Sequence, residues 1–338
     1  MSQVMNGAER RAANEAAIRQ FFSSWDPTWR WVLVLGLRDL RADLARLGHI
    51  AATETGSAEW DDESYVYGPL ALGLTAAAVN EVAQHCEDLF ALLSFLQEPM
   101  DFIKRTVSYP AGKVTRLAKV LLGESDTLIR SRFLVPTSQV IADGLSEAVD
   151  PAASEAAAEE AVTRLGALTR NVADWYLAQE FFHLQYKHGL KLPLRPFGSI
   201  LPPGTVNSRR ESLKAPLIAL TNEPLTKMLA KPPAQQLIVI PGLVPAIRDH
   251  IDDLLKDQAL LRYQMSGPEI DLDSVVEVSF TVLRLMRIAA DNRLTISNGA
   301  GPDSQQVFAL PGPGKYDTTH VRLKLTKQVL LGDFRRGR

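Results

Sequence analysis

The chain has 338 residues, of which 46% are hydrophobic and 22% charged, and its formal net charge at pH 7 is −2. These values are typical of a globular protein with a sizeable buried core. They exclude a global basic field that attracts nucleic acid or an acidic membrane, so any such binding requires a local patch.

The N-terminal part of the chain is predicted to be helical. A polar start without an apolar segment is not a secretory signal, and we expect a cytoplasmic protein. A first helix is predicted over residues 8–24. Asp26 and Pro27 form a cap followed by a first-turn proline, which predicts a second helix over 29–47. Residues 52–63 are polar and acidic and are expected to form a loop.

Two long helices are predicted, over residues 64–97 and 151–188. The first ends before Pro99, and the second follows the capping pair Asp150-Pro151. The apolar run 69–96 carries charged residues in its middle, which favours a core helix over a membrane span, so no membrane partner is expected. Helices of this length are expected to pack antiparallel as the centre of a bundle. Shorter helices are predicted between them at 101–108, 111–122, 126–133 and 137–148.

The sequence pattern changes after residue 190, where proline- and glycine-rich loops begin. Two β-type runs, 215–221 and 235–241, are predicted to form a hairpin. Two further helices are predicted at 243–264 and 272–291. The C-terminal strands are predicted at 293–297, 306–310 and 320–330.

The predicted fold class is mainly α, a helical bundle built on two long antiparallel helices, with a β-hairpin insertion and a few C-terminal strands. We expect residues 1–190 to form the helical bundle. Residues 191–338 then supply the loop, the hairpin, two helices and the C-terminal strands, packed on the bundle.

Polar residues interrupt an apolar stripe on the first long helix. Glu81, His85 and Asp88 lie within two turns of one another, with leucines at both ends of the stripe. This trio is either a buried site or the solvated middle of a helix whose ends are covered. The opposite, core face is expected to hold Leu72, Ala76, Val79, Val82, Cys86, Leu89, Phe90 and Leu93.

The second long helix carries a comparable polar face. Tyr176, Glu180, His183 and Lys187 share one side, whereas the core contact is expected from Val172, Trp175 and Phe182. Glu180 and His183 have the spacing of a carboxylate-bridged metal site in a bundle. Such a site needs a second pair of this kind, and Glu81 and His85 are one residue off the spacing. We therefore expect no metal and no cofactor.

Other catalytic motifs are absent from the sequence. It contains no phosphate-binding loop, no dinucleotide-binding glycine pattern, no nucleophile elbow and no zinc-type Cys/His pairs. The only cysteine, Cys86, excludes an internal disulfide and is predicted to be an inert core residue.

The stretch FFHLQYKHGL, residues 181–190, ends the second long helix. Together with Glu81, His85 and Asp88 on the first long helix, it resembles the HEPN superfamily of all-α domains. The resemblance implies two long helices and, in the nuclease members, an Arg and a His on the second one, meeting their copies across a homodimer. It would have His188 assist proton transfer and an arginine steady the phosphate. The nearest upstream arginine here is Arg170, which departs from that motif.

Two function hypotheses follow, and a third is weaker. The first is a non-catalytic HEPN-like module that binds a protein or RNA partner, in a defence or toxin–antitoxin type system, and the resemblance implies a homodimer. The second is a metal-independent endoribonuclease using His188, and the third is a metal-dependent oxidase-type bundle. The candidate catalytic residues are His188, His183 and Lys187. The candidate binding residues are Glu81, His85, Asp88 and Tyr186.

Overall fold

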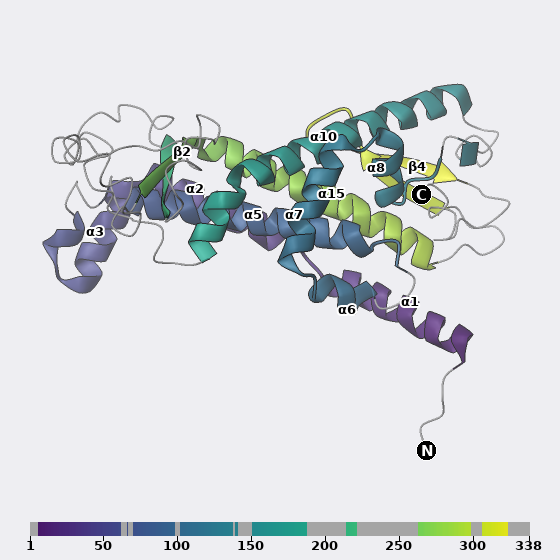
Figure 1. Cartoon of the computed structure of the whole chain (residues 1–338), viewed down its shortest axis with the longest axis horizontal. Coiled ribbons are helices and arrows are strands. Elements are labelled where there is room, and N and C mark those ends of the chain that lie inside the picture. The colour runs from purple at the N-terminus through teal and green to yellow at the C-terminus, as the bar shows by residue number, and fades with distance from the viewer. Residues whose placement is uncertain are drawn as a thin grey trace, which may run out of the picture. The chain divides into compact units, whose positions relative to one another are not determined.

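The computed structural model describes residues 6–61, 66, 70–98, 102–137, 139–140, 151–187, 214–221, 263–298 and 306–323. Most of this part of the chain is helical, with short antiparallel strand pairs, as Figure 1 shows. The chain divides into two compact units. Unit 1 contains residues 1–29, 84–178 and 280–338, and unit 2 contains residues 30–83 and 179–279.

The predicted first helix is confirmed as α1, Gly7–Ser24. Its first turn is closed by a reciprocal cap, in which the Asn6 side chain accepts from the backbone N–H of Glu9 and the Glu9 carboxylate accepts from the N–H of Asn6. Asp26 caps the next helix as predicted, since it accepts a 2.9 Å hydrogen bond from the N–H of Thr28. This helix, α2, spans Thr28–Ala42.

The single helix predicted over 29–47 is wrong, because the chain breaks at Asp43, whose φ of −132° and ψ of 58° are not helical. Aspartate prefers helix ends to helix interiors. After the break, α3 runs over Leu44–Thr55, and Leu44 joins Val66 and Ala71 in a small apolar cluster.

The loop predicted over 52–63 is also wrong in part, because α3 continues to Thr55 and a 3-10 helix, η1, follows over Ala58–Asp61. Gly56 ends α3 with a φ of 68°, the left-handed conformation that glycine adopts without steric cost.

The long helices are α5, Ala71–Phe95, and α10, Pro151–Lys187. Helix α5 begins several residues after the predicted start. Its predicted core face is buried, including Cys86 and Leu89 at 0% exposure, and Leu92 and Leu96 of the second stripe are buried as well. In the described part of the chain, no helix combines the length and the apolar character that crossing a bilayer requires.

The short helices are α6, Phe102–Val107, α7, Ala111–Gly123, and α8, Asp126–Arg132, as predicted. Most of the predicted helix 137–148 lies outside the described residues. Within unit 1 the core is formed by side chains of these helices, of α1, α5 and α10, and of the C-terminal elements. Its largest fully buried members are Phe90, Phe102, Phe133, Tyr176, Arg293 and Phe308.

The predicted strand 215–221 is confirmed as β1, Lys214–Thr221, but its described partner is β2, Tyr263–Asp271, in antiparallel register. The predicted partner 235–241 lies outside the described residues. The end of the predicted helix 243–264 is wrong where it is described, since Tyr263 is in a strand. Gly267 and Pro268 disfavour a helix in this segment.

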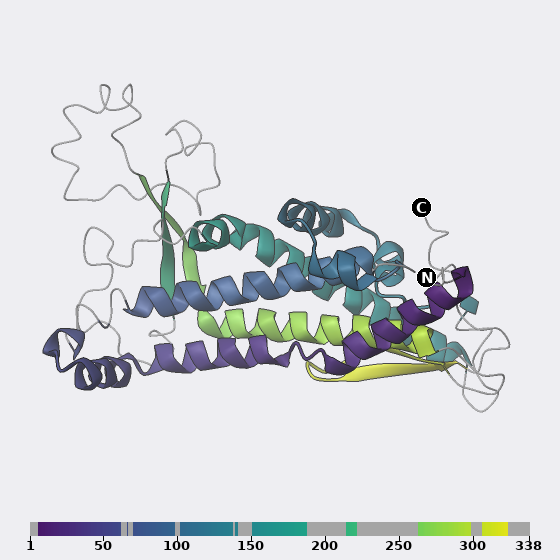
Figure 2. The same cartoon turned by 90° about the horizontal axis from the view of Figure 1, so that it is seen from below.

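Helix α15 spans Leu272–Asn298, so the strand predicted over 293–297 is wrong. The β-branched Thr295 and Ile296 favoured a strand, but tertiary contacts hold the segment helical. Arg293 donates to the carboxylate of Glu15 in α1, and Ile296 is buried. Figure 2 shows α15 in lime green and the C-terminal strands in yellow.

The strands predicted at 306–310 and 320–330 are confirmed as β3, Gln306–Pro311, and β4, Thr318–Leu323, an antiparallel pair in which Phe308 faces Val321. Residues 324–330 lie outside the described part. The amide of the buried Asn292 fastens β3 to α15, since it donates to the carbonyl of Ala309 and accepts from the N–H of the same residue. The side chain of Asn292 thus makes the two hydrogen bonds with the Ala309 backbone that a neighbouring strand would otherwise make.

Candidate functional site

The predicted polar residues of α5 and α10 are divided between the two units. Glu81 and His183 belong to unit 2, and His85 and Asp88 belong to unit 1. The two sets are therefore separate local environments, each with its own partners.

Glu81 forms an ion pair with Arg30 of α2, with 2.9 Å between the carboxylate and the guanidinium. The two side chains are 24% and 17% exposed, so the pair is shielded from most of the solvent. Arg30 was not predicted as a site residue, and its place one turn after the α2 cap gives no indication in the sequence that it reaches Glu81. The pair connects α2 to α5 within unit 2.

His183 is 1% exposed and its Nδ1 lies 2.8 Å from the Oδ1 of Asn80. Because Asn80 Oδ1 is an acceptor, the contact requires Nδ1 to carry the proton and donate it. The ring is enclosed in the interior of unit 2, where a polymeric substrate has no access to it. This contact connects α10 to α5.

The predicted metal spacing of Glu180 and His183 is present on α10, with Glu180 partly exposed and His183 buried. Among the residues that the structure describes, no group of three or more His, Cys, Asp or Glu side chains has an arrangement suited to a metal ion.

In unit 1, His85 is fully buried and Asp88 is partly buried. Gln84 lies beside them on α5, and its amide donates to Tyr109 Oη at 3.2 Å and weakly to Asp88 at 3.5 Å. Of the polar trio, His85 is therefore enclosed, whereas Glu81 and Asp88 are partly exposed.

A buried hydrogen bond between α5 and α10 was not predicted from the sequence. Glu87 is 4% exposed and accepts a 3.2 Å hydrogen bond from the hydroxyl of Tyr176, which is 2% exposed. The ring of Tyr176 also meets Phe90 edge to face, with 5.5 Å between centroids. The assumed core face of α10 needs correction, since Tyr176 and His183 are buried while Trp175 is only partly buried. Val172 and Phe182 are buried as predicted.

Cys86 lies on the same helix and is fully buried. Burial raises the pKa of its thiol well above the ordinary value, and the neighbouring carboxylates of Glu87 and Asp88 raise it further. A thiol in this environment stays protonated and is a poor nucleophile.

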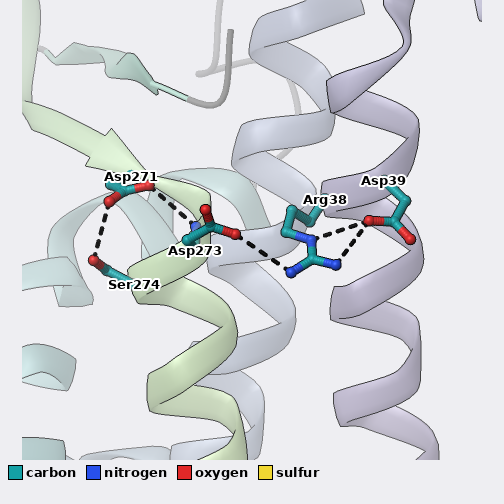
Figure 3. A network of polar contacts seen from close by, with 5 residues as sticks. All are labelled: Arg38, Asp39, Asp271, Asp273 and Ser274. Carbon is teal, nitrogen blue, oxygen red and sulfur yellow. Dashed lines mark hydrogen bonds and ion pairs between the residues drawn. The ribbon is translucent and has the colours of Figure 1, made fainter. Parts of the chain in front are cut away.

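A second polar network lies at the start of α15 in unit 2, and Figure 3 shows its five residues. Arg38 of α2 binds Asp39 at 2.9 Å and Asp273 at 3.3 Å. Asp271 accepts from the N–H of Asp273 and from the Ser274 hydroxyl, which caps the first turn of α15. The network fixes the start of a helix to α2.

The end of α10 contains the remaining candidates. Tyr186 is partly exposed in its last turn, and Lys187 is the last residue of the helix. The side chain of Lys187 and the whole of His188 lie outside the described residues. Of the three candidate catalytic side chains, only that of His183 is described by the structure.

The comparisons with known proteins gave no match: no protein-family model, no curated protein and no solved structure resembles this chain significantly.

Proposed function

We propose that the chain is a non-catalytic helical interaction module of the HEPN-like type, which acts by binding a protein or RNA partner in the cytoplasm, in a defence or toxin–antitoxin type system. The main support for this proposal is that two of the predicted site residues make contacts between helices. His183 is bound to Asn80 in the interior, and Glu81 is bound to Arg30. These side chains connect helices, and His183 is shielded from any substrate.

The contacts between α5 and α10 support the antiparallel arrangement that this proposal includes. In unit 2, Asn80 meets His183, and in unit 1, Glu87 meets Tyr176. The contact position moves forward along α5 while it moves backward along α10, which is the order expected of antiparallel helices.

The proposal includes a homodimer whose interface is the exposed face of α2. Val32 and Leu40 are 53% and 44% exposed, and each is four residues from the exposed Gly36. If two copies of α2 cross antiparallel at Gly36, Val32 of each copy meets Leu40 of the other, as a two-fold interface requires. An added Cβ at Gly36 would meet no atom within 4 Å, so a second backbone can approach there.

An RNA-cleavage assay in EDTA tests the non-catalytic part of the proposal. We expect the folded full-length protein to leave structured and unstructured RNA intact. Cleavage that persists in EDTA and disappears in His188→Ala would contradict the proposal and establish the endoribonuclease alternative. The matched control is His49→Ala, which removes an exposed histidine of α3.

A further inference from the structure

We propose that the outer surface of α6 and α7 binds single-stranded RNA through its phosphates. This inference rests on the proposed function, because it assigns a surface to the RNA partner of the module. The net charge of the chain requires such a binding site to be a local patch.

All charged residues of the segment that forms this surface are basic. Residues 102–123 contain five basic residues and no acidic residue, although the whole chain carries a net charge of −2. All five basic side chains are exposed. They are Lys104, Arg105, Lys113, Arg116 and Lys119.

The helical periodicity of α7 directs its charges outwards. Val114, Leu117, Ala118 and Leu121 recur at the spacing of one helix face, and all four are buried. Lys113, Arg116 and Lys119 occupy the other side of the helix and are exposed. With a rise of about 1.5 Å per residue, these three cations span about 9 Å along the helix.

The helix α6 of this surface is anchored on α1 by a buried aromatic residue. Phe102 is 0% exposed, and its ring packs against Phe21 and Phe22 of α1 at centroid distances of 6.0 and 5.6 Å. Residues 108–110 join α6 directly to α7. The cations are therefore carried by an ordered element, which reduces the entropy that binding would otherwise cost.

Two described carboxylates that follow α7 are paired with arginines outside the surface. Glu124, directly after α7, is bound to Arg132, and Asp126 is bound to Arg170 at 2.8 Å. Within the surface, Arg105 has an exposed contact with Glu98 at 3.3 Å, of the kind that contributes little free energy. The phosphates of a ligand would thus meet little competition.

The chemistry favours a nucleic-acid strand over an anionic membrane. Helices that lie in a membrane surface bury a continuous apolar face in the lipid. The apolar face of α7 is buried within the protein, and the apolar residues that stay exposed in α6 and α7 are Val107, Val120 and Leu122. A single strand is flexible and can follow a short patch of cations with its phosphates.

The test is fluorescence anisotropy with a 5′-labelled single-stranded RNA of mixed sequence, in EDTA, over a series of salt concentrations. The variant is Lys113→Glu/Arg116→Glu/Lys119→Glu. The matched control is Arg10→Glu/Arg11→Glu/Arg46→Glu, which makes the same change in charge at exposed positions of α1 and α3. Circular dichroism and thermal melting verify that both variants are folded.

We expect the α7 variant to lose at least tenfold in affinity and the control variant to lose less than threefold. The slope of log affinity against log salt should become shallower by about 2, because each phosphate contact to a single strand contributes about 0.7. Single-stranded DNA of the same sequence should bind within a few-fold of the RNA, since phosphates carry no base information.

The inference is wrong if the wild type binds no RNA or if both variants lose affinity equally. It is also wrong if vesicles of equal parts phosphatidylserine and phosphatidylcholine, or poly-glutamate, bind more tightly than RNA and lose binding in the α7 variant. A denaturing gel of the same samples separates this failure from that of the proposed function. Intact RNA without binding overturns only the surface, whereas cleaved RNA overturns the non-catalytic function.

Discussion

The guanidinium of Arg293 in α15 donates two hydrogen bonds to the carboxylate of Glu15 in α1, at 3.0 and 3.1 Å. The Arg293 side chain is 0% exposed and that of Glu15 is 20% exposed. Arg293 also donates to Ser297 at 2.5 Å. This bidentate pair holds α1 against α15 within unit 1 and combines charge with a fixed geometry.

The pair makes the stability of the protein depend on pH. Burial raises the pKa of Glu15, but hydrogen bonds with Arg293 and Ser297 and the charge of Arg293 outweigh burial, and the pKa is lowered from its ordinary value of 4.5. A lowered folded-state pKa stabilises the protein above the unfolded-state pKa, and this contribution is lost as the pH falls through the folded-state value.

Urea unfolding between pH 7 and pH 3 should show this loss in the wild type and a smaller loss in Glu15→Gln. The control Glu54→Gln changes an exposed carboxylate on α3 and should follow the wild type. Equal acid sensitivity of Glu15→Gln and the wild type would contradict the role of the pair.

Gly166 in α10 is predicted to resist replacement by alanine. An added Cβ would lie 2.2 Å from the carboxylate of Asp126 and 2.9 Å from the guanidinium of Arg170, which form an ion pair. In an ordinary helix interior, Gly→Ala stabilises by about 0.5–1 kcal/mol. We expect Gly166→Ala to give no stabilisation in the wild type, because the pair must separate. The same change should stabilise the Asp126→Ala background by about 0.5–1 kcal/mol. Urea unfolding measures both values, and a full gain in the wild-type background would show that the pair moves at no cost.

Cys86 is predicted to be unreactive in the folded state. Its thiol is fully buried, and burial together with Glu87 and Asp88 raises its pKa. At pH 8 we expect 5,5′-dithiobis(2-nitrobenzoic acid) to label the native protein only at the slow rate at which the core opens. Labelling in denaturant should be rapid and stoichiometric, since this is the only cysteine. Cys86→Ser supplies the blank. Rapid labelling of the folded wild type would place the thiol at an accessible surface instead.

The proposed homodimer is tested by light scattering after size-exclusion chromatography. Val32→Lys/Leu40→Lys places charges on the exposed face of α2. It should convert a dimer to a monomer, because the lysine at position 32 of each copy would meet the lysine at position 40 of the other. Val107→Lys/Val120→Lys is the matched control, since it changes exposed valines of α6 and α7 and should remain dimeric. A wild type that is monomeric at micromolar concentration, or a dimer that survives the α2 change, would exclude this interface.

Much of the helical part of the fold follows from local sequence features. The cap at Asp26 predicts the start of α2. The prolines and the apolar faces predict α6, α7, α8 and the cores of α5 and α10. The errors arise where tertiary contacts override local preference. Residues 293–297 favour a strand by composition, but the bond between Arg293 and Glu15, which are 278 positions apart, holds this segment in α15.

The candidate site could be predicted only as far as its helix faces. Periodicity places Glu81 and His183 on polar faces, but it contains no information about which helix each face meets. The partners Arg30 and Asn80 follow from packing between segments 51 and 103 positions apart. Periodicity also could not distinguish a polar face that is solvated from one that is buried. The burial of His85 was therefore one of two alternatives, and that of Tyr176 was not predicted.

A double-mutant cycle on Asn80 and His183 tests whether the polar residues of α5 and α10 have a structural role. Urea unfolding of the wild type, Asn80→Ala, His183→Ala and the double variant isolates the free energy of their contact. We predict a favourable coupling of about 0.5–1.5 kcal/mol, as for other hydrogen bonds inside proteins. The same four samples should leave RNA intact. No coupling, together with wild-type RNA cleavage that disappears in His183→Ala, would contradict the account and make His183 part of a catalytic site.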